Sequence, residues 1–142
     1  MNLSFREKSL WLLLASLCAV FAVYFASVLP ARSPQVAPAD IASFIGTVIV
    51  LVVIQVVGHT VLAIASRREL AASVQSDERD ELIRLKGARL ASYVLAVGVF
   101  CSLCLAVLVP GNFVFVHVLL AFWVVAQATE ILSQLVLYRR GA

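Results

Sequence analysis

Four long apolar runs constrain this chain of 142 residues more than any other feature. Each is close to the ~20 residues that an α-helix needs to cross a ~30 Å hydrocarbon core. A soluble domain of this size has too little interior to bury so much apolar surface, since 63% of the residues are hydrophobic. We therefore predict an all-α, polytopic membrane protein, a single four-helix bundle with transmembrane helices at about residues 9–29, 41–66, 88–109 and 113–138.

The first run follows a short charged stretch, so a secretory signal peptide has to be weighed. The run is longer than the ~7–15 apolar residues of a typical signal peptide, and Leu29, Pro30 and Ala31 make a poor cleavage site. We predict a retained signal-anchor helix.

Basic residues fall almost entirely on one side of the predicted topology. Of eleven Lys and Arg residues, the alternating helices leave only Arg32 on the opposite side. By the positive-inside rule we expect a multi-pass protein of the bacterial inner membrane with both termini in the cytoplasm. The net charge of +3 then reflects topology and contact with the lipid bilayer, and no nucleic-acid partner is expected. The cytoplasmic set is Arg6, Lys8, Arg67, Arg68, Arg79, Arg84, Lys86, Arg89, Arg139 and Arg140.

The connections between the helices carry clear turn signals. Prolines in the loop after the first helix favour extended backbone, and Asp40 is expected to be the N-cap of the second helix. Residues 109–112, Val-Pro-Gly-Asn, are so short a turn that the third and fourth helices must form an antiparallel hairpin.

The cytoplasmic segment at about residues 67–88 contains no proline and mixes charges of both signs. We expect it to be helical and to continue in part into the third membrane helix. Ser76, followed by acidic residues, reads as the start of that helix, because acids in the first turn oppose the positive end of the helix dipole.

Ionisable residues inside membrane helices are costly and are therefore the first candidates for function. Glu130 and His59 are predicted at nearly equal depth in the fourth and second helices. One turn further out Gln55 and Gln127 also match in depth, and Gln134 shares the face of Glu130. One interpretation is a proton-binding or cation-binding site between these two helices, with His59 as the partner of Glu130. The other is that these groups form hydrogen bonds that fix packing or an oligomer.

A second group of candidate residues is Cys101 and Cys104 with His117, which the predicted hairpin places at similar depth on the third and fourth helices. Thiolate and imidazole are ligands for copper or zinc, and a C-x-x-C pair also suits thiol oxidoreductase chemistry. A membrane oxidoreductase usually needs a further exposed cysteine pair, and the only other cysteine is Cys18 in the first helix. Cysteine is also an ordinary small apolar residue in such helices.

Motifs of hydrolases and nucleotide-binding enzymes are absent from the sequence: it has no Walker loop, no GxSxG and no HExxH. We therefore expect a protein that is not an enzyme and has no cofactor.

The stretch Asp77, Glu78, Arg79, Asp80, which leads into the third apolar run, resembles a DERD segment in a family of small bacterial four-helix membrane proteins of unknown function. The resemblance implies the same topology, and it points to these four residues as a cytoplasmic interaction site. A solvated charged face is the simpler interpretation of such a run.

Three hypotheses for function follow. The first is a non-enzymatic accessory or regulatory subunit that acts by assembly, as a homo-oligomer or with another membrane protein. The second is a small oligomeric proton-coupled transporter or channel that uses Glu130 and His59. The third is thiol-redox or metal chemistry at Cys101 and Cys104.

Overall fold

The computed structural model describes residues 5–31, 34–67 and 78–140, and it confirms the all-α four-helix fold. The helices are α1 (Phe5–Val28), α2 (Pro38–Ala65), α4 (Glu78–Leu108) and α5 (Phe113–Arg140), and the short 3-10 turn η1 (Leu29–Ala31) follows α1. All four long helices are long and apolar enough to span a membrane. The chain is thus a multi-pass membrane protein.

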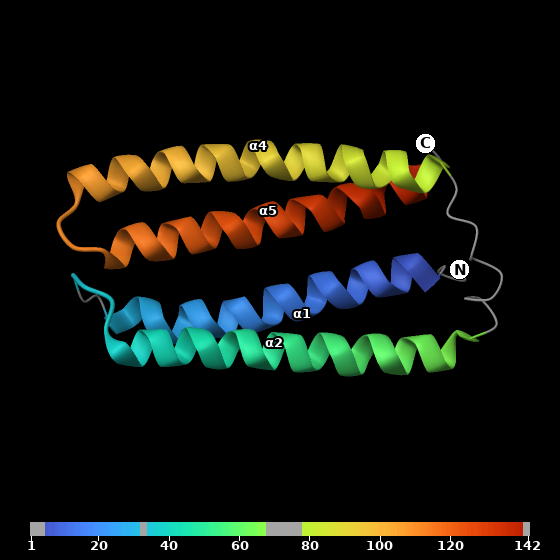
Figure 1. Ribbon diagram of the computed structural model, residues 1–142, viewed down its shortest axis with the longest axis horizontal. Helices are drawn as coiled ribbons and strands as arrows, with labels where there is room; N and C mark the ends of the chain where they lie inside the picture. The colour runs from blue at the N-terminus through green and yellow to red at the C-terminus, as the bar shows by residue number, and fades with distance from the viewer. Residues whose placement is uncertain (1–4, 32–33, 68–77, 141–142) are drawn as a thin grey trace.

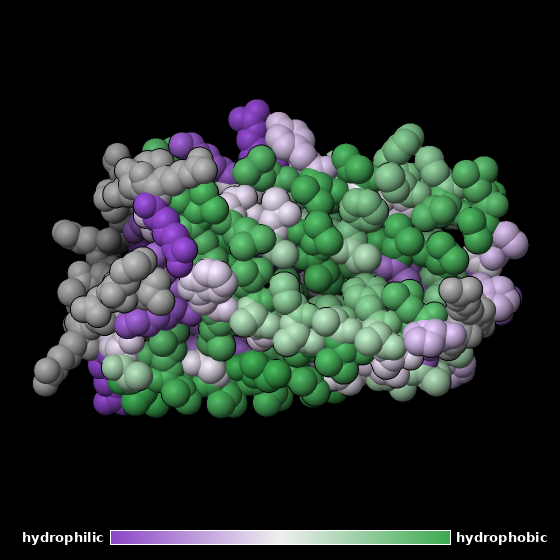
Figure 2. Space-filling model, turned by 180° about the vertical axis from the view of Figure 1, so that it is seen from behind, coloured by the Kyte–Doolittle hydropathy of each residue, from purple (hydrophilic) through white to green (hydrophobic). Residues whose placement is uncertain are grey.

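The helices pack as a row of neighbours in the order α4, α5, α1, α2 (Figure 1). Along the helix axes, α1 begins and α5 ends at the same end of the bundle, here called the terminal end. The connections from α1 to α2 and from α4 to α5 lie together at the other end, the hairpin end. Figure 2 shows apolar side chains over most of one face, with strongly hydrophilic side chains gathered toward the terminal end.

The start of α2 corrects one expectation. Asp40 is not the N-cap, because the helix begins at Pro38 with Ala37 as its N-cap. Proline suits this first position, where its missing N–H would have no helical partner. Asp40 lies two residues further on, and its Oδ2 accepts a hydrogen bond from the Ala37 backbone N–H at 2.8 Å. The carboxylate therefore still stabilises this end of the helix, but from inside its first turn.

The third membrane helix continues from the charged segment, as predicted. α4 has 31 residues, which corresponds to about 46 Å at 1.5 Å per residue and exceeds a ~30 Å hydrocarbon core. Its described start is Glu78, and the predicted start at Ser76 lies outside the described residues.

Small residues allow α4 and α5 to pack closely as the predicted antiparallel hairpin. Gly98 lies directly against the side chain of Phe122, with no room for a Cβ. Gly87, nearer the terminal end, lies over the backbone of Glu130 and the flexible side chain of Gln134. Such close approach is the usual basis of helix association in lipid, where the hydrophobic effect contributes little.

The two connections at the hairpin end bind each other. The Phe113 N–H donates to the Pro34 carbonyl at 3.3 Å, and the Val36 N–H donates to Oδ1 of Asn112 at 2.9 Å. Gly111 has a φ of 91°, and a Cβ at this position would overlap the Pro34 carbonyl. Glycine is therefore required here both by backbone conformation and by space.

Apolar and aromatic side chains fill the bundle between the middle and the hairpin end. Phe21 is only 2% exposed and contacts Tyr24 and Trp123 edge to face, with ring centroids 6.2 and 6.0 Å apart. In contrast, Leu51 is the only buried residue of α2. The core cluster comprises Leu17, Phe21, Tyr24, Val28, Leu51 and Phe113.

Candidate functional site

A polar cavity of about 340 Å³ lies inside the membrane-spanning part of the row. It contains four of the five polar residues that the sequence places at similar depth, and α1 contributes a wall of leucines that the sequence interpretation did not include. The cavity is lined by Leu10, Leu13 and Leu17 of α1, Leu51 and Gln55 of α2, and Trp123, Gln127, Glu130, Ile131 and Gln134 of α5.

Glu130 is the only acidic residue among the described residues that line this polar cavity. Its Oε1 accepts a hydrogen bond from the Gln134 amide, one helical turn away, at 3.3 Å. Gln55 and Gln127 supply further amide groups in the same cavity. A carboxylate surrounded by amides in a partly enclosed space is a chemically suitable site for a proton or a small cation.

His59 is not the partner of Glu130. Its Nε2 lies 2.9 Å from the Ser9 hydroxyl on α1, and its Nδ1 lies 2.8 Å from the Gln55 carbonyl. A carbonyl can only accept, so Nδ1 carries a proton, and in the neutral ring Nε2 accepts from Ser9. The neighbouring Gly58 packs against Leu12, which explains the close approach of α1 to α2 at this level. His59 thus links α1 to α2.

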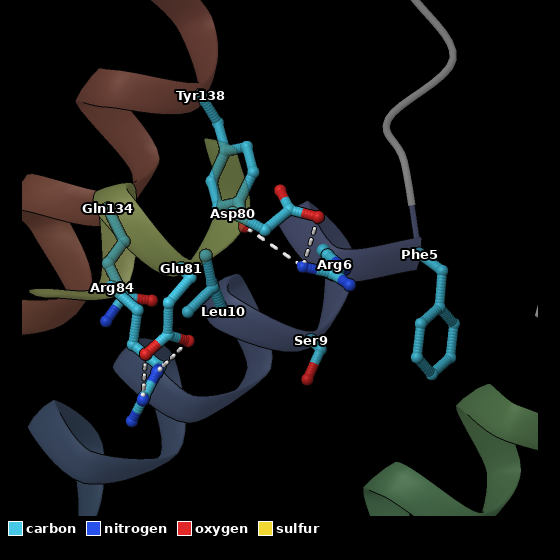
Figure 3. Close-up of a pocket in the computed structure, with 9 residues that line it drawn as sticks. All are labelled: Phe5, Arg6, Ser9, Leu10, Asp80, Glu81, Arg84, Gln134 and Tyr138. Atoms are coloured by element: carbon cyan, nitrogen blue, oxygen red, sulfur yellow. Dashed lines mark hydrogen bonds and ion pairs between the residues drawn. The ribbon is translucent and has the colours of Figure 1, made fainter. Parts of the chain in front are cut away.

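An ionic cavity of about 320 Å³ lies at the terminal end, between the start of α1, the start of α4 and the end of α5 (Figure 3). Arg6 Nη1 pairs with Asp80 Oδ2 at 2.5 Å and donates to the Tyr138 hydroxyl at 3.5 Å. Arg84 forms two hydrogen bonds to the carboxylate of Glu81, at 2.6 and 3.2 Å. The first set of contacts ties three helices together, whereas the second lies within α4.

The two cavities adjoin. Leu10 and Gln134 line both of them, and Ser9, the partner of His59, lines the ionic cavity. Toward the hairpin end the polar cavity is bounded by Leu17, Leu51 and Trp123, of which the two leucines belong to the core cluster. The polar groups near Glu130 are therefore closer to the terminal end than to the hairpin end.

The DERD segment is only partly described. Asp77 lies outside the described residues. Glu78 and Arg79 form the first turn of α4, and nothing further is described for their side chains. Asp80 is engaged within the chain by Arg6. That ion pair uses one of the four residues that the family resemblance implied for interaction.

The structure does not bring Cys101, Cys104 and His117 together. Cys104 is exposed on the outer surface of α4, whereas His117 is buried at 4% exposure. The Tyr24 hydroxyl lies 3.1 Å from Nε2 of His117, and the Phe113 carbonyl lies 2.8 Å from Nδ1. Among the residues that the structure describes, no group of three or more His, Cys, Asp or Glu side chains is placed to hold a metal ion.

Several residues at these sites were not singled out from the sequence. Arg6 was used only as a topology marker, and Ser9 only as the start of an apolar run. Tyr24 was not connected with His117, although a tyrosine and a histidine within apolar helices each need a hydrogen-bond partner. The sequence therefore indicates that each of the two side chains has a hydrogen-bond partner, but it does not reveal which helices are neighbours.

No family model, curated protein or solved structure matches the chain. The resemblance based on the DERD segment therefore stays an expectation, and the candidate site rests on geometry and chemistry.

Proposed function

We propose that the chain is a small transport protein of the bacterial inner membrane, in which Glu130 binds a proton during passage through the bundle. The observation that carries this proposal is the adjoining pair of cavities, which offers Glu130 a polar route toward the terminal end. An ionisable side chain inside a membrane helix is costly, and exchange of protons with the terminal end through the adjoining ionic cavity gives Glu130 a function.

The charge distribution supports placing the terminal end in the cytoplasm. Arg67 lies just after α2, and Lys86 and Arg89 lie in the first half of α4. Together with Arg6, Lys8, Arg84 and Arg139 they place seven Lys and Arg residues toward this end. By the positive-inside rule, the ionic cavity then opens toward the cytoplasm, and Glu130 exchanges protons with that side.

The proposal predicts that proton flux depends on the carboxylate of Glu130. Wild-type protein in liposomes should take up protons under a potassium diffusion potential, as reported by a trapped pH dye. Glu130→Gln keeps the shape and removes the titratable group, so the rate should fall by at least about tenfold, within the range seen for loss of a positioned acid–base group. Glu7→Gln makes the same chemical change in the first turn of α1, outside both cavities, and should retain the flux.

Equal rates for wild type and Glu130→Gln would contradict the proposal. A wild-type rate no higher than that of empty liposomes would do the same, and it would turn attention to assembly.

Assembly is the second candidate, and the surface of α2 favours it. Only Leu51 of this 28-residue helix is buried, and Gly46 has nothing within 4 Å of the place where a Cβ would lie. A homo-oligomer or a membrane partner that packs on α2 would use this exposed, mostly Val and Ile surface, with Gly46 as the point of close approach. Gly46→Leu should then shift the oligomeric state in nanodiscs to the monomer and leave the fold of the chain intact, because no neighbour within the chain is displaced.

A further inference from the structure

A third cavity, of about 460 Å³, lies in the half of the molecule nearer the hairpin end. All four long helices contribute to it: Tyr24 from α1, Asp40 and Phe44 from α2, Leu95 from α4, and Trp123 from α5. Trp123 also lines the polar cavity, so the two spaces adjoin at this residue. The volume is within the ~300–1,000 Å³ range of small-molecule sites.

The walls of this cavity are mostly apolar and include three aromatic rings. Tyr24 and Phe44 lie edge to face with centroids 6.1 Å apart, and Trp123 contributes the third ring. Aromatic faces carry negative potential and attract organic cations, tryptophan most strongly. The rings therefore offer both apolar contact and a preference for positive charge.

The charge of the cavity is set by one residue. Asp40 is the only Asp, Glu, Lys or Arg among the described residues that line it. The helix start fixes its carboxylate, because Oδ2 accepts from the Ala37 N–H. His117, which also lines the cavity, is held by the Phe113 carbonyl 2.8 Å from Nδ1 and by the Tyr24 hydroxyl 3.1 Å from Nε2. The described lining contains no Lys or Arg side chain to balance the carboxylate of Asp40.

We propose that this cavity binds a lipophilic organic cation, whose apolar body contacts the rings of Tyr24, Phe44 and Trp123 while its charge is balanced by Asp40. The proposed function names only the proton bound by Glu130; the inference adds an organic cation as the substrate class of the same transport protein, and in that respect it rests on the proposed function. Binding itself requires no flux, so it is tested separately.

The test uses the full chain in nanodiscs of zwitterionic lipid, in a Trp11→Phe background. The chain has two tryptophans, so this variant leaves Trp123 as the only one and makes its fluorescence a direct report on the cavity. The probe is the tetraphenylphosphonium cation. Tetraphenylborate, which has nearly the same shape and the opposite charge, is the matched control, and empty nanodiscs correct for partition into lipid.

We expect saturable binding of tetraphenylphosphonium and an affinity for tetraphenylborate at least about tenfold weaker. Asp40→Asn should weaken cation binding by about tenfold and should not weaken borate binding, because it removes both the attraction of the cation and the repulsion of the anion. Asparagine retains an oxygen that accepts from the Ala37 N–H, so the start of α2 keeps its hydrogen bond. A circular dichroism spectrum identical to that of the parent confirms this.

Equal affinity for the two ions would overturn the inference and would indicate a groove filled by any apolar group, such as a lipid chain. Unchanged cation binding in Asp40→Asn would also overturn it. Failure of this inference is distinguishable from failure of the proposed function. No cation binding together with flux that depends on Glu130 refutes the ligand site alone. Cation binding with flux that is indifferent to Glu130→Gln refutes the proton route alone.

Discussion

The two halves of this molecule are held together in different ways. Near the hairpin end, α1 and α5 share a buried aromatic cluster, α4 and α5 meet at Gly98, and the two connections are hydrogen-bonded to each other. Near the terminal end the helices are joined by polar side chains, Arg6 to Asp80 and Ser9 to His59, around two polar cavities. The hairpin half is thus joined by apolar and backbone contacts and contains an apolar cavity, whereas the terminal half is joined by polar side chains and contains two polar cavities.

The largest expected effect compares two glycines of α4. A Cβ at Gly98 would overlap the Cβ of Phe122, which the backbone of α5 holds in place, whereas a Cβ at Gly87 would meet the flexible side chain of Gln134 at 3.0 Å and the Glu130 carbonyl oxygen at 3.1 Å. Gly98→Ala should therefore cost at or above the upper end of the ~1–3 kcal/mol typical of overpacking, and Gly87→Ala clearly less. Thermal unfolding of both variants in detergent measures the difference.

Equal destabilisation by the two substitutions would contradict the comparison, since it would mean that α4 and α5 are packed with the same tightness in both halves.

A smaller effect compares the two histidines. Tyr24→Phe removes the hydroxyl that lies 3.1 Å from Nε2 of the buried His117, and should cost about 1–3 kcal/mol because that nitrogen loses its donor where water has no access. Ser9→Ala removes the partner of His59, which is only partly buried, and should cost about 1 kcal/mol or less. Thermal unfolding in detergent measures both costs. A larger loss of stability for Ser9→Ala than for Tyr24→Phe would mean that the terminal half depends more on its histidine contact than the hairpin half does.

The features of the fold that depend on neighbouring residues in the chain were predictable from the sequence, whereas contacts between helices were not. Run length and turn composition are local, so the four helices, the turn at residues 109–112 and the continuation of the charged segment into α4 were predictable. Which helices are neighbours is not local. His59 and Glu130 do match in depth, but α1 lies between α2 and α5, so His59 meets Ser9 instead.

The polar cavity was partly predictable for the same reason. Gln127, Glu130 and Gln134 share one face of one helix, and their spacing along the chain is enough to group them. The contribution of Leu10 and Leu13 depends on the position of α1, which no spacing in the sequence encodes. The start of α2 was predicted near Asp40, but the prediction of Asp40 as N-cap was wrong, because Pro38 is compatible with the first helical position and the helix begins there.

The smallest expected effect concerns the contact that joins three helices at the terminal end. The side chains of Arg6 and Asp80 are 37% and 20% exposed, so their ion pair should contribute no more than ~1 kcal/mol. Asp80→Asn should lower the unfolding midpoint slightly, and raising the salt concentration should reduce the difference from wild type. Glu81→Gln, which breaks a pair within α4 alone, is the matched control and should have less effect on stability. A salt-independent loss well above this range for Asp80→Asn would show that the terminal end is as firmly held as the hairpin end.

The hydrogen bonds between the two connections at the hairpin end have a mechanical consequence. They join the α1–α2 pair to the α4–α5 pair through Phe113 to Pro34 and Val36 to Asn112. At this point Gly111 is in close contact with the Pro34 carbonyl. If the pairs separate, this end acts as the pivot, and the displacement grows with distance from it. The largest displacement then occurs at Arg6 and Asp80, about one helix length away. Their weak ion pair therefore limits the angle between the α1–α2 pair and the α4–α5 pair.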